Sequence, residues 1–549
     1  MNETKTGAFG WYPRLINWIM NICLFVLMFI FPLIFNDGYY DIPEVKYECY
    51  YLSILVTLGL VILLSVVHLF QTRDFHWQDY LNFSKWKKIL LPTDLILLLF
   101  WLAVLISTLQ SDYLYESVWG NEGRFTGLFL ISVYVVAYFM VSRIWNFKPW
   151  ALQVFLISGM IMCLIGISDY FQMDFLKVKA DAMPSQKALF TSTIGNINSY
   201  TAYVALIMGF STAMFWVEEN VLRKTWYYVC MIVSFFAIVM GCSDNAYLAL
   251  GTLFGLSPLV LFKKYDGLKK YFSVLASFFT VIQCIVWINE RFADRVLGLN
   301  SLFQVMASFR GLLPFILLLW AITAAFAVTE RKDFNKEKII HCSLRIWKLI
   351  LVLGIAVVIV AFCDANFFGH AERYSSLSNY LVFNDSWGTD RGYIWKASMR
   401  LYAKFPFIRK LFGYGPETFG ILTVTKIQDE MVSATGLIFD NAHNEYLQDL
   451  VTLGAVGLIT YLMFLFSAFR AMYKNREQSP YLPALLLATL CYNVQAVVNL
   501  NQPIVAPMMW LMISIGMSTR IKQEPSPVVE TELCDNETSL SAEDEQSSN

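Results

Sequence analysis

The chain has 549 residues, of which 57% are hydrophobic and only 15% charged, whereas a soluble chain carries about a quarter charged residues. This composition excludes an ordinary soluble protein and indicates a chain surrounded by membrane lipid. The formal net charge of −1 gives no reason to expect nucleic acid as a partner. The ten cysteines form no Cys-x-x-Cys pair and no Cys/His cluster, so neither a zinc site nor a disulfide framework is predicted.

Apolar segments recur along most of the chain, and a helix that crosses a membrane needs about 20 apolar residues. Fourteen segments are expected to be membrane spans, at 15–35, 51–71, 89–110, 127–147, 150–170, 196–217, 226–242, 245–262, 271–288, 309–329, 346–367, 447–470, 481–500 and 503–519. The first run lacks a small-residue cleavage site and is expected to be a retained anchor. The sequence leaves open whether 226–262 forms two spans or one re-entrant hairpin.

The distribution of Lys and Arg predicts the orientation, because short cytoplasmic loops of membrane proteins are enriched in both residues. With an even number of spans and the N-terminus inside, the cytoplasmic segments hold Lys85, Lys87, Lys88 and the basic run 263–270. Both termini are then cytoplasmic. Four parts are expected: transmembrane helices 1–11 at 1–367, a long extracytoplasmic loop at 368–446, the C-terminal transmembrane helices at 447–520, and a disordered acidic cytoplasmic tail at 521–549.

The long loop contains a segment with helical periodicity. In DRGYIWKASMRLYAKFP, residues 390–406, apolar residues recur at three- and four-residue steps, which predicts one amphipathic helix. Thr389 or Asp390 can cap its start, and Pro406 ends it.

The decapeptide DNAHNEYLQD, residues 440–449, stands at the start of the next apolar run. Asp440 or Asn441 is expected to be the N-cap of this helix, which places His443 in its first turn. The positive helix end disfavours imidazolium, so His443 should be neutral at pH 7 and able to accept a proton. The same end attracts phosphate, which suggests chemistry on a phosphorylated lipid. The alternative is that His443 is only an interfacial anchor.

Four stretches, GNEGRFTGL at 120–128, TSTIGNINSYTAYVAL at 191–206, DRGYIWKASMRLYAKFPFIRKLFGYGPETFG at 390–420 and AHNEYLQDLVTLGAVGLITY at 442–461, resemble one family. It is the O-antigen ligase and Wzy-type polysaccharide polymerase superfamily of bacterial membrane glycosyltransferases. The last two stretches are the specific ones, with an Arg-x-x-x-Trp, Pro and Gly-x-Gly pattern followed by His-Asn-x-Tyr-Leu.

The resemblance implies an all-α integral membrane protein, a multispan helical bundle of GT-C type with about 12–14 transmembrane helices. It also implies transfer of a glycan from an undecaprenyl-pyrophosphate carrier to a glycan or glycolipid acceptor, by a ligase or a polymerase. The active site would lie on the extracytoplasmic face of the bacterial cytoplasmic membrane. Many family members have Ser-Arg where this chain has Ser243 and Asp244, which reverses the charge at that position.

The resemblance carries the loop arginine of the family onto Arg391 and, in an earlier outer segment, an arginine onto Arg124. We assign both to the leaving phosphate, because a guanidinium holds phosphate oxygens in two-point contact and stays protonated. Arg391 can equally be a helix-start residue that is paired with Asp390. If Arg124 does not replace the missing cation at 244, the acceptor differs or the alignment there is displaced.

The family's histidine falls on His443, the candidate base that takes the proton of the acceptor hydroxyl and contributes roughly two to four powers of ten in rate. Glu445 or Asp440 can orient it or serve as the base instead. The outer loops contain no Asp-x-Asp, so neither a divalent metal nor another cofactor is expected. A single direct attack inverts the anomeric centre, as the family implies.

The predicted substrate-binding residues are Asp390, Trp395, Tyr414, Asn441, Asn444, Glu445 and Asn196. Trp395 follows Arg391 by one helical turn and can stack on a sugar ring, although an anchoring role is favoured. Tyr414 has the same ambiguity and is placed nearer the core. Asn196 can line an entry for the polyprenyl chain or simply cap the start of a span.

Two other classes of function remain as alternatives. A multispan transporter, such as a flippase of lipid-linked oligosaccharides, usually places its ionisable residues near the bilayer midplane. In this chain the spans carry few charges and the polar cluster lies in the long loop. A non-catalytic assembly partner needs no positioned histidine and arginine, so both alternatives predict that His443→Ala leaves polymer linkage unchanged.

Overall fold

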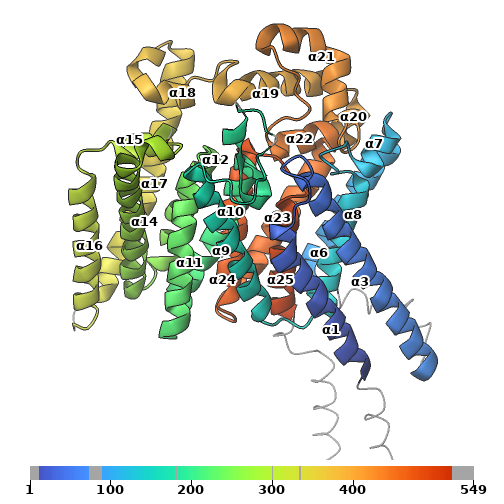
Figure 1. The fold of residues 1–549 in the computed structure, drawn as a ribbon, viewed down its shortest axis with the longest axis horizontal. Coiled ribbons are helices and arrows are strands. Elements are labelled where there is room, and N and C mark those ends of the chain that lie inside the picture. Colours follow the sequence, from blue (N-terminus) through green and yellow to red (C-terminus); the bar gives the residue numbers. More distant parts are fainter. Residues whose placement is uncertain are drawn as a thin grey trace, which may run out of the picture.

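The computed structural model describes residues 11–72, 90–180, 182–184, 186–299, 301–332 and 335–521. Within these ranges the regular elements are helices, apart from one short antiparallel pair of strands, β1 (Phe190–Thr191) and β2 (Gly195–Asn196). Figure 1 shows the long helices side by side in one bundle, with the helices of the long loop gathered over one end. The predicted class, a multispan helical membrane protein, is confirmed.

The N-terminal third contains α1 (Trp11–Phe25), the π-helical turn η1 (Val26–Ile30), α2 (Phe31–Leu33), α3 (Ile42–Thr72), α6 (Pro92–Leu109), α7 (Leu114–Trp119), α8 (Leu128–Phe139), the π-helical turn η2 (Met140–Ile144), α9 (Trp150–Tyr170), η3 (Lys187–Leu189) and η4 (Ser192–Ile194). The middle contains α10 (Ile197–Val217), α11 (Val221–Met240), α12 (Asn245–Leu256), α13 (Pro258–Leu261), α14 (Tyr265–Arg291), η5 (Ala293–Arg295), α15 (Ser301–Ala307), α16 (Leu312–Thr329) and α17 (Lys336–Phe367). The long loop contains η6 (Ala371–Leu377), α18 (Ser378–Leu381), α19 (Trp387–Lys404), α20 (Phe407–Phe412) and α21 (Phe419–Thr435). The chain continues with α22 (Glu445–Thr452), α23 (Gly454–Lys474), α24 (Tyr481–Gln495), η7 (Ala496–Val498) and α25 (Ala506–Ile521).

Eleven helices within the described ranges are long and apolar enough to cross a membrane. Three further predicted spans correspond to shorter apolar helices, Leu128–Ile144, Asn245–Leu261 and Ala506–Thr519. The uncertain segment 226–262 forms two separate helical stretches, α11 and then α12 with α13, joined by a short turn. Lys85, Lys87 and Lys88, and residues 522–549 of the expected tail, lie outside the described residues.

The two ends of the bundle differ in character. The Gln110 side chain, just after α6, donates to the carbonyl of Gly413 (3.2 Å), so this end of the bundle contacts the long loop. The basic run 263–270 lies at the other end, where the Lys263 ammonium donates to the Tyr473 hydroxyl (3.1 Å) near the end of α23. The long loop and this basic run are therefore separated by the length of the helices.

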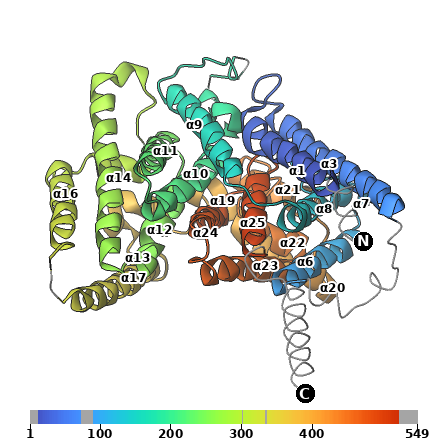
Figure 2. The ribbon, with the colours of Figure 1, turned by 90° about the horizontal axis from the view of Figure 1, so that it is seen from below.

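Helix α10 lies in the centre of the bundle and α17 at its edge. Of the most apolar stretch of each helix, 89% is buried inside the protein in α10 and none in α17. Figure 2 shows α10 enclosed by neighbouring helices, whereas α14, α16 and α17 lie at one side of the molecule. In a membrane, lipid would contact most of the length of α17.

The predicted amphipathic helix of the long loop is confirmed as α19. Ile394, Ala397 and Leu401 are buried in a second small core, which also includes residues of α21 and α22. The helix ends at Lys404, two residues before Pro406, as expected.

The predicted caps of this helix, Thr389 and Asp390, are wrong. Both residues have left-handed backbone angles (φ +61° and +64°), and regular helical geometry begins after them. Neither side chain makes a capping hydrogen bond within the described structure; the Tyr393 amide instead donates to the carbonyl of Asp385 (3.0 Å). The folded-back backbone satisfies this donor, so a side-chain cap is not needed there.

Candidate functional site

His443 lies just before α22 and not in its first turn, contrary to the prediction. Helix α22 begins at Glu445, and its N-cap is Asn444, whose side-chain oxygen accepts a hydrogen bond from the Leu447 amide (3.0 Å). The predicted caps at 440 and 441 are therefore wrong.

Asp440 and Asn441 shape the turn that carries the histidine. The side-chain oxygen of Asn441 accepts a hydrogen bond from the backbone amide of His443 (2.9 Å), and its amide group donates to the Asp440 carboxylate. His443 has a positive φ of +47°, which a residue with a side chain adopts only where its surroundings favour it. Asn441 is engaged in holding this turn and cannot cap the helix.

Arg124 reaches this turn from a distant part of the chain. Its Nε lies 3.1 Å from Oδ2 of Asp440, and its Nη2 lies 3.0 Å from Oδ1, which makes a two-point ion pair. The pair links the segment between α7 and α8 to the segment before α22. Arg124 is mostly shielded (22% exposed), whereas Asp440 remains open to solvent (60% exposed).

Arg124 and His443 line one cavity of about 350 Å³. Its other lining residues include Glu122, Asn196, Asn198, Ser199, Asp440, Asn499 and Gln502. The lining is mainly polar, and its residues come from four separate stretches of the chain.

Two arginines and burial set the protonation of His443. Burial, followed by the charges of Arg391 and Arg124, lowers the pKa of His443 from 6.5 to about 4, and the Asp440 carboxylate opposes this shift. The imidazole is therefore neutral at pH 7, as predicted from the sequence. The cause differs from the predicted one, because His443 precedes the helix and the two guanidinium groups act in place of the helix dipole.

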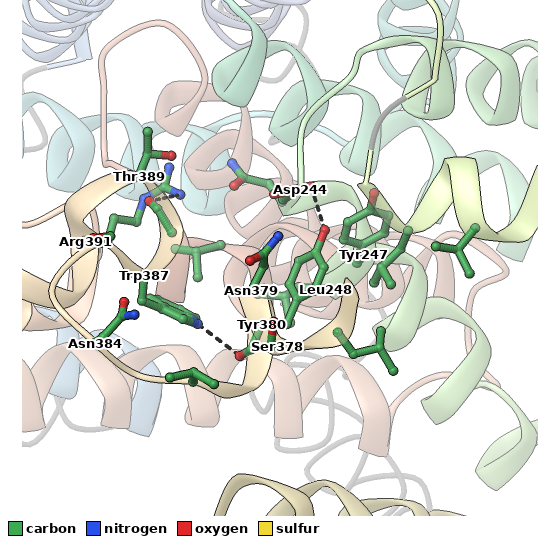
Figure 3. Close-up of a pocket in the computed structure, with 18 of the residues that line it drawn as sticks. Asp244, Tyr247, Leu248, Ser378, Asn379, Tyr380, Asn384, Trp387, Thr389 and Arg391 are labelled. Atoms are coloured by element: carbon green, nitrogen blue, oxygen red, sulfur yellow. Dashed lines mark hydrogen bonds between the residues drawn. The ribbon is translucent and has the colours of Figure 1, made fainter. Parts of the chain in front are cut away.

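Arg391 lines a second, larger cavity of about 1490 Å³ (Figure 3). Its Nη1 donates to the carbonyl of Gly388 (3.2 Å), while its buried Nε has no hydrogen-bond partner within the described structure. The expected alternative partner, Asp390, forms no ion pair with it among the described residues. Burial lowers the pKa of Arg391, and the Asp244 carboxylate opposes this shift.

Trp395 connects the helix of Arg391 to the turn of His443. Its indole Nε1 donates to the carbonyl of Ala442, the residue before His443, at 2.9 Å. Its ring lies tilted against Trp387, with 5.2 Å between the ring centroids, and lines the larger cavity. The Trp395 side chain thus joins two stretches that are 47 residues apart in the chain.

Glu445 faces away from His443 and into the bundle. It is only 1% exposed and accepts hydrogen bonds from the Tyr461 hydroxyl (2.8 Å) and the Asn501 amide (3.1 Å). Burial raises the pKa of Glu445 to about 7. It lines a small third cavity of about 60 Å³, which Arg124 also lines. Within the part of the chain that the structure describes, no contact joins Glu445 to the imidazole, so in this arrangement it does not orient His443.

The other predicted substrate-binding residues have different positions. Asn196 caps α10 by accepting from the Asn198 amide (2.8 Å), and it also lines the cavity of His443. Tyr414 packs in the core of the loop, where its ring lies 4.6 Å from that of Phe405. Neither Tyr414 nor Asp390 lines the cavities of His443 and Arg391.

The polar stretch Asn499–Gln502 between α24 and α25 was not among the site residues predicted from the sequence. The side-chain oxygen of Gln502 accepts from the Ser199 hydroxyl (2.9 Å), and the Asn499 amide donates to the carbonyl of Asn198 (3.2 Å). These contacts close one wall of the His443 cavity. The sequence signal was the run NLNQP at 499–503, which is polar although it separates two apolar spans.

Residues 296–462 match a protein-family model described as O-Antigen ligase. The match covers the long loop and includes Arg391 and His443, whereas Arg124 and Asn196 lie before it. No curated protein matches the chain.

Proposed function

We propose that this multi-pass membrane protein moves a glycan from an undecaprenyl-pyrophosphate carrier to a glycan or glycolipid acceptor, and the match of residues 296–462 to an O-antigen ligase model supports this proposal. The reaction would serve surface-polysaccharide assembly. The observation that carries the proposal is that His443 lines one cavity with Arg124, where burial, followed by the charges of Arg391 and Arg124, lowers the pKa of its imidazole.

The two arginines are suited to the pyrophosphate of the donor. The buried Nε of Arg391 lacks a partner, which is costly unless a ligand supplies an acceptor. Arg124 is already neutralised in part by Asp440, so it can exchange one carboxylate contact for a phosphate contact. Two guanidinium groups stabilise the charge that develops on the leaving pyrophosphate.

His443 is suited to remove the proton of the acceptor. The acceptor hydroxyl oxygen forms a bond to the anomeric carbon, and its proton passes to the imidazole. The bond from the anomeric carbon to the pyrophosphate oxygen breaks, and its electron pair stays on that oxygen. One such displacement inverts the anomeric centre.

We expect glycan transfer to be independent of divalent metal, because the arginines provide the positive charge at the leaving group. Transfer by membranes treated with EDTA should match that of untreated membranes, and added Mg²⁺ should not increase it. A loss of transfer in EDTA that Mg²⁺ restores would contradict this assignment of the charge.

The pH dependence of kcat/KM reports the pKa of His443 in the free enzyme, and that of kcat reports its pKa in the substrate complex. We expect the two profiles to differ. His443 acts only when unprotonated, and its pKa in the free protein is about 4. The value of kcat/KM should therefore stay constant as the pH is lowered from 7 and fall only near pH 4. A bound diphosphate offsets the two arginine charges and raises the pKa of His443, so kcat should fall at a higher pH than kcat/KM. Coincident falls in both profiles near 6.5, the ordinary histidine value, would contradict this coupling.

The active site is proposed to face outward, with both termini in the cytoplasm. The basic run 263–270 lies at the bundle end away from the long loop, and basic residues favour the cytoplasmic side. The large polar loop would then lie where a polysaccharide is assembled.

Deletion of the encoding gene, followed by analysis of carrier-linked glycans, tests the proposed function. Single repeat units should accumulate if the protein polymerises, and full-length chains should accumulate if it ligates. An unchanged glycan profile with altered solute uptake would contradict glycosyl transfer and support a transporter.

A further inference from the structure

The larger cavity, of about 1490 Å³, lies between the membrane helices and the long loop. Residues from α12, α15, α18 and the start of α19 line it, and Figure 3 shows Asp244 and Tyr247 on one side with Trp387 and Arg391 on the other. Sites for drug-sized ligands occupy about 300–1,000 Å³. A cavity of this size can therefore hold a ligand of several sugar units.

The walls of this cavity combine aromatic rings with amide groups. Its aromatic residues include Tyr247, Tyr380, Trp387 and Trp395, and its amide side chains include Asn245, Gln304, Asn379 and Asn384. The Trp387 indole donates to the carbonyl of Tyr380 (3.0 Å), which fixes α18 against the start of α19. Flat apolar faces beside hydrogen-bonding groups suit saccharides, whose rings have both apolar and hydroxyl-bearing surfaces.

Opposite charges lie on different walls of the same cavity. Asp244 precedes α12 but makes no capping hydrogen bond, and among the described residues its Oδ1 accepts one long hydrogen bond (3.4 Å), from the Tyr380 hydroxyl. The Asp244 carboxylate acts to raise the pKa of Arg391, yet the two side chains form no ion pair within the described residues. Glu372 adds a second carboxylate to the lining. The carboxylates of Asp244 and Glu372 can thus accept hydrogen bonds from a ligand in this cavity, while the guanidinium of Arg391 can bind the diphosphate of the donor.

We propose that this cavity binds the saccharide portion of a glycan substrate and that Asp244 selects neutral or amino-bearing sugars over acidic ones. A carboxylate accepts hydrogen bonds from hydroxyl or ammonium groups and repels a carboxylate or phosphate on the ligand. The inference rests on the proposed glycosyl transfer and adds the substrate class that the site accepts.

The test is calorimetric titration of the purified full-length protein, in lipid nanodiscs, with three tetrasaccharides. The probes are the neutral tetramer of N-acetylglucosamine, the cationic tetramer of glucosamine and the anionic tetramer of galacturonate. The wild-type protein should bind the anionic probe roughly tenfold more weakly than the neutral one, as expected for one repulsive charge contact. Asp244→Asn should remove most of this difference, and Asp244→Arg should reverse it.

Asp294→Arg is the matched control, because Asp294 is an exposed carboxylate in η5 that does not line this cavity. It should retain the wild-type order of affinities. The same order in the wild-type protein and in both Asp244 variants would overturn the selective role of Asp244. If none of the three probes bound to the wild-type protein, the assignment of the cavity to saccharides would be overturned as well.

The proposed function is tested separately by polymer linkage in cells that carry His443→Ala. If linkage were lost in His443→Ala and the order of probe affinities were the same in the wild-type protein and the Asp244 variants, only this inference would be overturned. If linkage were retained in His443→Ala and the order of probe affinities changed in the Asp244 variants as expected, the catalytic proposal would be overturned. The assignment of the cavity to saccharides would then still stand.

Discussion

Replacement of His443 by alanine should lower the rate of glycan transfer by roughly two to four powers of ten, the usual contribution of a general base. The reason is that the acceptor hydroxyl would lose its proton acceptor while both arginines remain in place. The rate is measured with membranes supplied with the carrier-linked donor and the acceptor, and polymer linkage is measured in cells. The binding of the donor should change little, because the arginines provide the contacts to its diphosphate.

His370→Ala is a suitable control for this experiment. His370 also lies in the long loop, but its imidazole pairs with Asp364 (2.8 Å), and it lines none of the three cavities. This variant should transfer glycan at the wild-type rate. If His443→Ala were as active as His370→Ala, His443 would not be the base.

Replacement of Arg391 by lysine should lower kcat by roughly two to three powers of ten, as loss of one donor to a developing oxyanion does elsewhere. Lysine keeps the positive charge but loses the planar fork, and the Nε–H group of Arg391 has no hydrogen-bond partner among the residues that the structure describes. Single-turnover measurements with carrier-linked donor separate this loss from a loss of donor binding.

Arg400→Lys, in the same helix α19, is the matched control. Arg400 is about half exposed and pairs with Glu430 on the surface of the loop at 2.5 Å. A surface pair of this kind contributes little, so the variant should behave as the wild-type protein does. Equal activity of Arg391→Lys and Arg400→Lys would exclude a two-point contact from Arg391 in the rate-limiting step.

Periodicity in the sequence predicted the apolar helices of the bundle and α19, but it did not predict α21, which was expected to be loop. The apolar runs predicted the bundle, and the steps between Ile394, Ala397 and Leu401 predicted both α19 and its buried face. Such patterns succeed because the burial of one helix face depends on residues that are near in the chain.

The local geometry of the site was not predictable in the same way. The segment 440–445 holds several residues that can cap a helix, and the choice of Asn444 follows from contacts elsewhere. Asp440 is held by Arg124, which lies 316 residues away in the chain, and Asn441 is held by the amide of His443. Propensity ranks these residues almost equally, so tertiary contacts decide which one caps the helix.

The position of Asp244 shows the same limit. The sequence showed a carboxylate at position 244, where the resemblance had led us to expect an arginine. It did not reveal that Asp244 shares a large cavity with Arg391, because residues that are distant in the chain, from α12 and from the long loop, line that cavity together.

The most direct measurement is a cryo-electron microscopy structure of the protein with undecaprenyl pyrophosphate bound in a nanodisc. We expect the diphosphate to lie within hydrogen-bond distance, about 2.7–2.9 Å, of both Arg124 and Arg391, with the His443 imidazole facing the adjoining space. A diphosphate bound at the opposite end of the bundle, or away from both arginines, would contradict this expectation.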